Sequence, residues 1–347
     1  MAEKGETLIR VQELSVGYGG GETKRRRRRM SAPVRAVDGV TLELAAGECL
    51  GVIGESGSGK STFGYALLNL LPKPGRILGG SVELAGVGDL AALSEHQWQK
   101  VRGNRIGMVF QGAQSMFNPL MTFEQQLRDT FRAQNRDPGT GMVEARDLLK
   151  RARLDPERIL RSYPHELSGG MRQRVAIVAG AMLGPDLLIL DEPTTALDVL
   201  SQAMVLEILK ELRSLKNMSM IFITHDFSVA SNISDRIAVM YAGRIVEVGN
   251  VRSIYRRSGH PYTRALIRSV PSLSAHTVEL VSVPGQPPDM RNLPPGCRFA
   301  PRCPLAVAAC QGAADMRLET VGDSADHAVM CIRREDMMRE EVAMPSG

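Results

Sequence analysis

Nine residues in the first fifth of the chain, GESGSGKST from Gly54 to Thr62, have the types and spacing of a loop that holds phosphate. They match the pattern G-x-x-x-x-G-K-[ST], follow the apolar run CLGVI and precede a segment with helical periodicity. Glycines let the backbone wrap closely around phosphates, and the free N–H groups at a helix start attract their negative charge. We expect Lys60 to reach the terminal phosphates and Ser61 to bind Mg²⁺. The predicted phosphate-binding residues are Gly54, Ser56, Gly57, Gly59, Lys60, Ser61 and Thr62.

A second pair of candidate residues ends the apolar run LLILDEP, where Asp191 and Glu192 stand side by side. The run is typical of a buried strand, and ligands bind at the carboxyl ends of parallel strands. One acidic residue there can hold Mg²⁺ through water, and a second can polarise an attacking water. By itself such a run is equally consistent with a plain strand end. Together with the phosphate loop it predicts hydrolysis of a nucleoside triphosphate.

The segments around these residues have the periodicity of an α/β protein. Residues 7–50 show short strand-like runs, and a helical segment follows the phosphate loop and stops at Pro72. From about 112 to 180 apolar residues recur at helical spacing. The apolar runs DLLILDEP, SMIFITHD and RIAVMYAGRIVEVG then alternate with helical sequence, which predicts a core of buried parallel strands.

The segment ELSGGMRQR, Glu166–Arg174, resembles the signature motif of ABC-type ATPases. The family motif usually reads LSGGQ, and this chain has Met171 at the last position while Ser168, Gly169 and Gly170 are intact. A serine hydroxyl and backbone amides at a helix start form an anion site. A serine that simply caps a helix fits the same residues, and the two interpretations do not exclude each other.

Four further residues occur in the order in which the family places its motifs. Gln111 in VFQGAQ resembles the glutamine that senses Mg²⁺ and the attacking water, and Asp198 ends TTALD, which resembles the D-loop. His225 in FITHD resembles the histidine that contacts the γ-phosphate, and Tyr18 in LSVGY resembles the aromatic residue that stacks on adenine. Each alone is more often structural than functional, but together they support the resemblance.

The resemblance implies a cassette with a parallel sheet core, an antiparallel β subdomain and a helical subdomain at about 112–180. It implies ATP as substrate, Mg²⁺ bound by Ser61 and Gln111, and Glu192 as general base, with catalysis by positioning and electrostatics. In the family each ATP lies between the phosphate loop of one subunit and the signature of a second. A second ATPase subunit, either a copy or a paralogue, is therefore an expected partner.

The relatives with other roles are disfavoured by the length and layout of the chain. DNA-repair and chromosome-organising members insert long coiled coils into the cassette, whereas Lys60 and Asp191 are only 131 positions apart, with no heptad run. Translation-acting members carry two cassettes, and fused exporters carry membrane spans; this chain shows one cassette and no stretch of 18 apolar residues. A cassette that serves separate membrane subunits is the best interpretation.

The carboxy-terminal part sharpens that interpretation. SGHPYTRALIRSVPSL, Ser258–Leu273, and the later LPPGCRFAPRCPLA closely resemble the extension of dipeptide/oligopeptide importer ATPases. The resemblance implies two transmembrane permease subunits, an extracytoplasmic substrate-binding protein and a peripheral position on the cytoplasmic face of the cell membrane. Nickel, opine and oligosaccharide importers share the extension, so the cargo stays open. We expect the cassette at 1–250, the extension at 251–335 and a tail at 336–347.

The extension holds four of the five cysteines, spaced C-x5-C-x6-C-x20-C. The N-terminus lacks the apolar core of a signal peptide, so we expect a reducing compartment in which structural disulfides are rare. From spacing alone an iron–sulfur cluster, zinc and free thiols are equally plausible. The resemblance favours a [4Fe–4S] cluster that staples a region of little apolar content, with zinc as the alternative. The four residues are Cys297, Cys303, Cys310 and Cys331.

The net charge of +5 owes much to the run KRRRRR, Lys24–Arg29. Such a run more often forms a solvated loop than a nucleic-acid site, so no nucleic-acid partner is expected. The run and the cysteines leave one alternative to the transport ATPase, an ATP-dependent iron–sulfur or nucleic-acid-associated regulator. That alternative predicts salt-sensitive nucleic-acid binding and no permeases.

Overall fold

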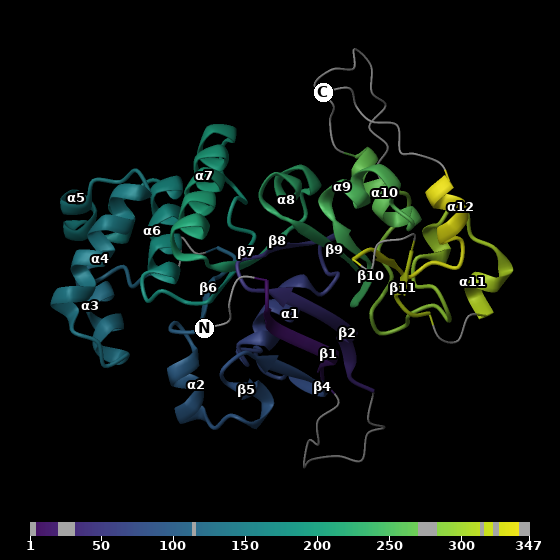
Figure 1. Cartoon of the computed structure of the whole chain (residues 1–347), viewed down its shortest axis with the longest axis horizontal. Helices are drawn as coiled ribbons and strands as arrows, with labels where there is room; N and C mark the ends of the chain where they lie inside the picture. Colours follow the sequence, from purple (N-terminus) through teal and green to yellow (C-terminus); the bar gives the residue numbers. More distant parts are fainter. Residues whose placement is uncertain are drawn as a thin grey trace. The chain divides into compact units, whose positions relative to one another are not determined.

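The computed structural model describes residues 5–19, 32–112, 116–269, 283–312, 316–321 and 326–339, which Figure 1 draws in colours that follow the sequence. The chain forms two compact units, each assembled from separate segments. The first unit comprises Met1–Leu8, Leu44–Cys49 and Leu84–Ile223, and the second comprises Ile9–Glu43, Leu50–Glu83 and Thr224–Gly347. The basic run Lys24–Arg29 and most of the predicted tail lie outside the described residues.

The first unit is built on parallel strands. Strand β7 (Leu187–Asp191) pairs in parallel with β6 (Ile106–Val109) on one side and with β8 (Ser219–Thr224) on the other. Every residue of these strands is buried, which explains why each reads as an unbroken apolar run rather than an alternating one. The predicted parallel sheet core is confirmed.

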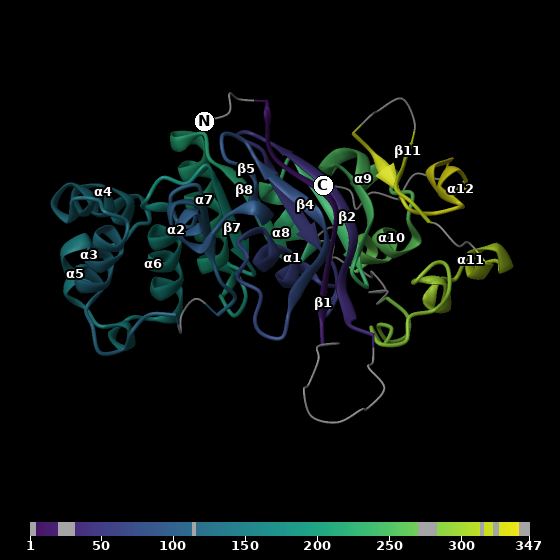
Figure 2. The ribbon, with the colours of Figure 1, turned by 90° about the horizontal axis from the view of Figure 1, so that it is seen from below.

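Helices cluster beside these strands in the first unit, and Figure 2 shows α3, α4 and α5 gathered together. Helix α3 (Phe123–Ala133) contacts α4 (Pro138–Arg151) and α5 (Pro156–Arg161), and α4 also contacts α6 (Gly169–Ala181), which packs on β6. Thr122, Asp137 and Asp155 cap α3, α4 and α5 by accepting backbone N–H groups. This unit also contains β5 (Gly88–Asp89), α2 (Glu95–Val101) and α7 (Val199–Lys216).

The second unit holds two sets of strands. In one, β1 (Thr7–Tyr18) pairs with β2 (Val34–Ala45) and with β4 (Arg76–Leu84). In the other, β9 (Arg236–Tyr241) pairs in parallel with β3 (Cys49–Ile53) and antiparallel with β10 (Arg244–Asn250). In β2 the run VTLEL alternates between buried and exposed residues, as in a strand with one buried face.

The extension adds to this unit rather than standing apart from it. Its strand β12 (Ala328–Val329) pairs with β10, and β11 (Glu319–Thr320) pairs with β12. Helices α1 (Lys60–Leu67), α8 (Phe227–Ile233), α9 (Val251–Arg257), α10 (Pro261–Arg268), α11 (Ala308–Gly312) and α12 (Arg334–Arg339) complete the unit. None of the helices within the described ranges has both the length and the apolar character needed to span a bilayer.

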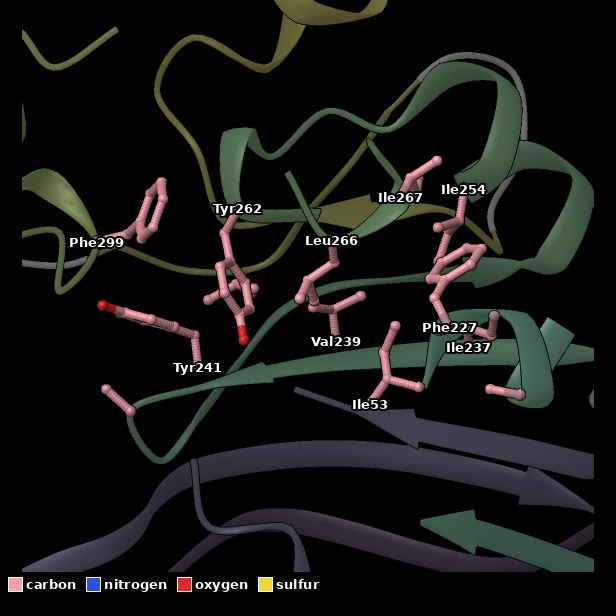
Figure 3. Close-up of a cluster of buried hydrophobic side chains, with 13 residues drawn as sticks. Ile53, Phe227, Ile237, Val239, Tyr241, Ile254, Tyr262, Leu266, Ile267 and Phe299 are labelled. Carbon is pink, nitrogen blue, oxygen red and sulfur yellow. The ribbon is translucent and has the colours of Figure 1, made fainter. Parts of the chain in front are cut away.

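The core of the second unit includes side chains from the extension (Figure 3). Ile53 and Val239 of the sheet and Phe227 of α8 lie in one cluster with Tyr262 of α10 and with Phe299. Tyr262 is fully buried and Phe299 is 2% exposed. The expectation that the extension has little apolar content to pack is therefore wrong for these segments: α10 and Phe299 bury large rings in a shared core.

A charged cluster in the second unit makes its stability depend on pH. Asp38 of β2 accepts hydrogen bonds from Arg35 (2.7 Å), Arg244 (3.1 Å) and Arg298 of the extension. Burial raises the pKa of Asp38, but the three arginines outweigh burial and lower it to about 2. The unfolded chain thus binds a proton at higher pH than the folded chain does. The stabilisation is present above the unfolded pKa of 3.8 and is lost as pH falls toward 2.

An Asp38→Asn variant is expected to lose about 2 kcal/mol of unfolding free energy at pH 7, because the three arginines lose their anionic partner. Its stability should also depend less on pH between about 4 and 2. Urea unfolding followed by circular dichroism at several pH values measures both effects. Parallel pH profiles for variant and wild type would contradict the assignment.

Candidate nucleotide site

The phosphate loop connects β3 to α1, and two of its glycines are required by close backbone contacts. Gly59 has φ +104°, and a Cβ atom there would lie 2.2 Å from the carbonyl oxygen of Ala36. A Cβ at Gly54 would lie 2.1 Å from the carbonyl oxygen of Met240. Larger residues are excluded at both positions. No side-chain hydrogen bond caps α1 at Gly59. The positive end of a helix dipole favours an anion at such a terminus.

Lys60 and Tyr18 lie at this loop. The Lys60 side chain is buried, and its Nζ donates to the carbonyl oxygens of Gly54 (2.7 Å) and Glu55 (2.9 Å). Tyr18, at the end of β1, has its hydroxyl 3.5 Å from Thr62 Oγ1. The predicted adenine-stacking residue therefore stands beside the phosphate loop. Two other predicted residues, Ser56 and Gly57, lie in the turn before α1, and Ser61 lies in the first turn of that helix.

The predicted acidic residues end β7, and a glutamine joins them. Asp191 is fully buried as the last residue of β7, whereas Glu192 is partly exposed. Glu192 Oε2 accepts hydrogen bonds from Thr195 Oγ1 (2.8 Å) and Gln111 Nε2 (3.4 Å). Glu192 has φ +49°, which strains a non-glycine residue by about 1–3 kcal/mol. The structure thus holds this carboxylate in a defined place and brings Gln111 to it.

The signature and the D-loop lie next to each other in the first unit. Ser168 caps α6 by accepting the N–H of Met171 (3.3 Å), and the helix begins at Gly169. A Cβ at Gly170 would lie 3.3 Å from Ser201 Oγ. Ser201 in turn donates its N–H and hydroxyl to the carboxylate of Asp198, at 2.9 Å and 2.7 Å. These two hydrogen bonds lower the pKa of the Asp198 carboxyl.

The predicted site residues are divided between the two units. The second unit carries the phosphate loop, Tyr18 and His225, which is exposed between β8 and α8. The first unit carries Gln111, Asp191 and Glu192 together with the Ser168–Gly170 signature and Asp198.

Comparison with known proteins decides the family. Residues 37–195 match the ABC transporter family, and residues 246–310 match a family described as the C-terminal region of oligopeptide/dipeptide transporters. The chain is 40% identical over 306 residues to the dipeptide transport ATP-binding protein DppD of Caldanaerobacter subterraneus subsp. tengcongensis, covering 88% of this chain and 91% of that protein. This chain is an ABC transporter ATP-binding cassette.

Other relatives agree with that assignment. The cassette is 39% identical to the oligopeptide transport ATP-binding protein OppD of Escherichia coli K12, with 92% of each chain covered. Among solved structures it resembles the dimeric cassette MJ0796 bound to ADP and Pi, with a TM-score of 0.60 and 27% identity over 71% of this chain and 99% of that one. The α/β cassette fold is confirmed, and nothing in these matches favours the nucleic-acid-associated regulator.

The four cysteines of the extension line one small cavity, with a volume of about 20 Å³. Burial raises the pKa of the Cys297 and Cys303 thiols, and it raises that of Cys331 to about 11, so these thiols are protonated at neutral pH. In the described part of the chain, no three His, Cys, Asp or Glu side chains are arranged to hold a metal ion. A ready-made zinc site is therefore not found there, and the cluster stays a prediction.

Sequence reasoning missed contacts between the extension and the phosphate loop. The Glu55 carboxylate is paired with Arg302, and the Glu55 N–H donates to the hydroxyl of Tyr262 at 2.8 Å. Arg302 follows Glu55 by 247 positions, so no local spacing could have paired them. The only signal was a charged residue within a phosphate-binding loop.

A Lys60→Ala variant of the cassette is expected to bind MgATP about 10–100-fold more weakly, because it loses a charge-assisted contact to phosphate. Isothermal titration calorimetry measures the affinity. The matched control is Lys100→Ala, which removes the same charge from an exposed position on α2 and should bind MgATP as tightly as wild type does. Equal affinities for the two variants would contradict the role of Lys60.

Proposed function

We propose that this cassette is the ATP-hydrolysing subunit that powers uptake of dipeptides or oligopeptides through a membrane ABC importer. The observation that carries the proposal is the match of residues 246–310 to the C-terminal region of oligopeptide/dipeptide transporters. Relatives named as dipeptide and oligopeptide transport ATP-binding proteins, similar over about nine-tenths of the chain, support it.

ATP would bind through the phosphate loop. Lys60 would turn its ammonium group from the carbonyls of Gly54 and Glu55 to the β- and γ-phosphates, and the start of α1 would receive phosphate oxygens. The ring of Tyr18, beside Thr62, would stack on adenine. Mg²⁺, when bound with ATP, offsets phosphate charge; Ser61, Gln111 and, through water, Asp191 would hold it.

Hydrolysis would use the residues at the end of β7. The Glu192 carboxylate would accept a proton from water as the water oxygen bonds to the γ-phosphorus. The bond from that phosphorus to the bridging oxygen breaks, and ADP leaves with the electron pair. Gln111 would orient the water, since it already contacts Glu192, and His225 would contact the γ-phosphate.

Ser168, Gly169, Gly170 and Asp198 would complete the ATP site of a second ATPase subunit, either a copy or a paralogue. Their supporting feature is exposure: Ser168 and Asp198 are exposed, and Val199 and Leu200 beside them are 82% and 81% exposed. Apolar side chains that open to solvent suit a surface that another subunit covers. The pair would bind two permease subunits from the cytoplasmic face of the membrane, with a substrate-binding protein delivering peptide outside.

Uptake of isotope-labelled peptides of two to six residues tests the proposal. Cells that lack this chain should lose uptake, and the wild-type chain should restore it while Glu192→Gln, produced at equal level, should not. Retention of uptake for every peptide length in the deleted strain would refute the peptide cargo. Recovery of permeases and a second ATPase on affinity purification would support the predicted partners.

We further propose that the four cysteines of the extension bind a [4Fe–4S] cluster. Their chemistry supports it, since three thiols of one segment, Cys297, Cys303 and Cys310, line one cavity with Cys331 of another. Cysteine thiolates are the usual ligands of such a cluster, and these four residues would hold it. The bound cluster would cross-link these segments. Anaerobic purification should give about four irons and four sulfides per chain, lost in Cys303→Ser; one zinc per chain, or no metal, would overturn the proposal.

A further inference from the structure

The extension forms an ion pair with the phosphate loop, between Arg302 and Glu55. Arg302 donates from Nη1 to Glu55 Oε2 at 2.7 Å and from Nη2 to Glu55 Oε1 at 2.9 Å. The two bonds form a bidentate fork, the strongest geometry for an arginine–carboxylate pair. The Arg302 side chain is 5% exposed and the Glu55 side chain 26% exposed, so solvent screens the pair far less than a surface pair.

Arg302 is itself held firmly. Its Nε donates to the carbonyl oxygen of Pro284 at 2.6 Å, and its Nη1 donates to the hydroxyl of Tyr241 at 3.2 Å. Arg302 ends a short 3-10 turn, Ala300–Arg302, and Phe299 just before that turn packs in the core. Because Pro284 and Tyr241 already hold the guanidinium group, Arg302 can fix the position of the Glu55 side chain.

Tyr262 provides a second, independent contact to Glu55. Its ring lies in the buried cluster with Tyr241 and Phe299, with ring centroids 4.6 Å and 5.4 Å away (Figure 3). Its backbone N–H donates to Nδ1 of His260 (3.1 Å), which fixes the start of α10. From this position the Tyr262 hydroxyl accepts the Glu55 N–H, and the Glu55 carbonyl accepts Lys60 Nζ.

We propose that Arg302 and Tyr262 are positioning residues for ATP binding, through which the extension sets the conformation and charge of the phosphate loop. Arg302 offsets the negative charge of Glu55 next to the place where the triphosphate would bind. Tyr262 fixes the Gly54–Glu55 peptide, whose carbonyl oxygen, that of Gly54, accepts a hydrogen bond from Lys60 Nζ at 2.7 Å. The inference rests on the proposed binding of ATP at this loop. Because Arg302 adjoins Cys303, whatever displaces the cysteine-bearing segment is expected to weaken ATP binding as well.

Removing the charges of Arg302 and Glu55, singly and together, separates a positioning role from a general effect on stability. In Arg302→Gln, the Glu55 carboxylate is left without its cation and repels phosphate, so the Kd for MgADP and the KM for MgATP should rise about tenfold or more. Adding Glu55→Gln removes the repelling charge, so the double variant should recover most of that affinity. Tyr262→Phe, which leaves the Glu55 N–H without its acceptor, should raise the Kd about threefold to tenfold.

The matched control is Arg298→Gln, four residues away in the same segment. Arg298 pairs with Asp38 and donates to the carbonyl of Ala242, with no contact to the phosphate loop among its bonds. It should lower the unfolding temperature while leaving the Kd within twofold of wild type. Arg302→Lys keeps the positive charge but loses the bidentate geometry, so its Kd should be intermediate. If Arg302→Gln does not fold, Arg302→Lys and Tyr262→Phe test the inference in its place.

The measurements are calorimetric titration of the full-length chain with MgADP, ATPase kinetics and thermal unfolding. A Kd within twofold of wild type in Arg302→Gln would overturn the inference. So would a double variant that binds more weakly than Arg302→Gln, or an Arg298→Gln variant that loses as much affinity. A wild-type chain that binds no nucleotide would instead overturn the proposed function, so the two failures are distinct.

Discussion

A Glu192→Gln variant is expected to bind MgATP as tightly as wild type and to hydrolyse it about 10²–10⁴-fold more slowly. Glutamine keeps an oxygen at the position that Thr195 and Gln111 contact, so the local geometry should persist. What it loses is the ability to take a proton from the attacking water. Single-turnover phosphate release, combined with calorimetric titration, separates the lost chemical step from binding.

The control for this variant is Glu207→Gln on α7. Glu207 forms an exposed ion pair with Arg153 at 2.9 Å, with side chains 62% and 56% exposed, and it lies outside both sets of site residues. It should hydrolyse ATP as wild type does. If Glu192→Gln retained turnover within threefold of Glu207→Gln, the general-base role would have to pass to another residue.

A Glu247→Ala variant is expected to lose about 3–5 kcal/mol of unfolding free energy. Glu247 of β10 is fully buried, and its carboxylate accepts the N–H groups of Gly259 (2.7 Å) and His260 (3.2 Å). It also lies 2.9 Å from Nε2 of His327, next to β12. Removal of the carboxylate leaves several buried polar groups unsatisfied at both ends of the extension, which is costly in a low dielectric.

Urea unfolding measures the loss, and limited proteolysis shows whether the extension is released first. Glu43→Ala is the matched control, because Glu43 pairs with Arg10 on the surface, where side chains are 53% and 42% exposed. Such a pair contributes only about 0–1 kcal/mol. Equal unfolding midpoints for Glu247→Ala and Glu43→Ala would show that the extension is held by its apolar contacts alone.

The sequence by itself determined the parts of this protein that depend on short spacing. The phosphate loop from Gly54 to Thr62 needs glycines at fixed offsets, and the strand before Asp191 needs an unbroken apolar run. These requirements act between neighbours along the chain, through backbone geometry and the period of the side chains. They therefore predicted the candidate nucleotide site and identified the parallel core.

Only the tertiary structure decided what the polar side chains of the extension contact. Arg302 and Glu55 are far apart in the chain, and so are Glu247 and His327, yet each pair is in contact. No sequence period connects such residues, because their meeting depends on how α10, Phe299 and β12 pack against the core. Packing also makes the extension part of the buried core, although its sequence was expected to have little apolar content. Tyr262 buries its ring in that core while its hydroxyl accepts the Glu55 N–H of the phosphate loop.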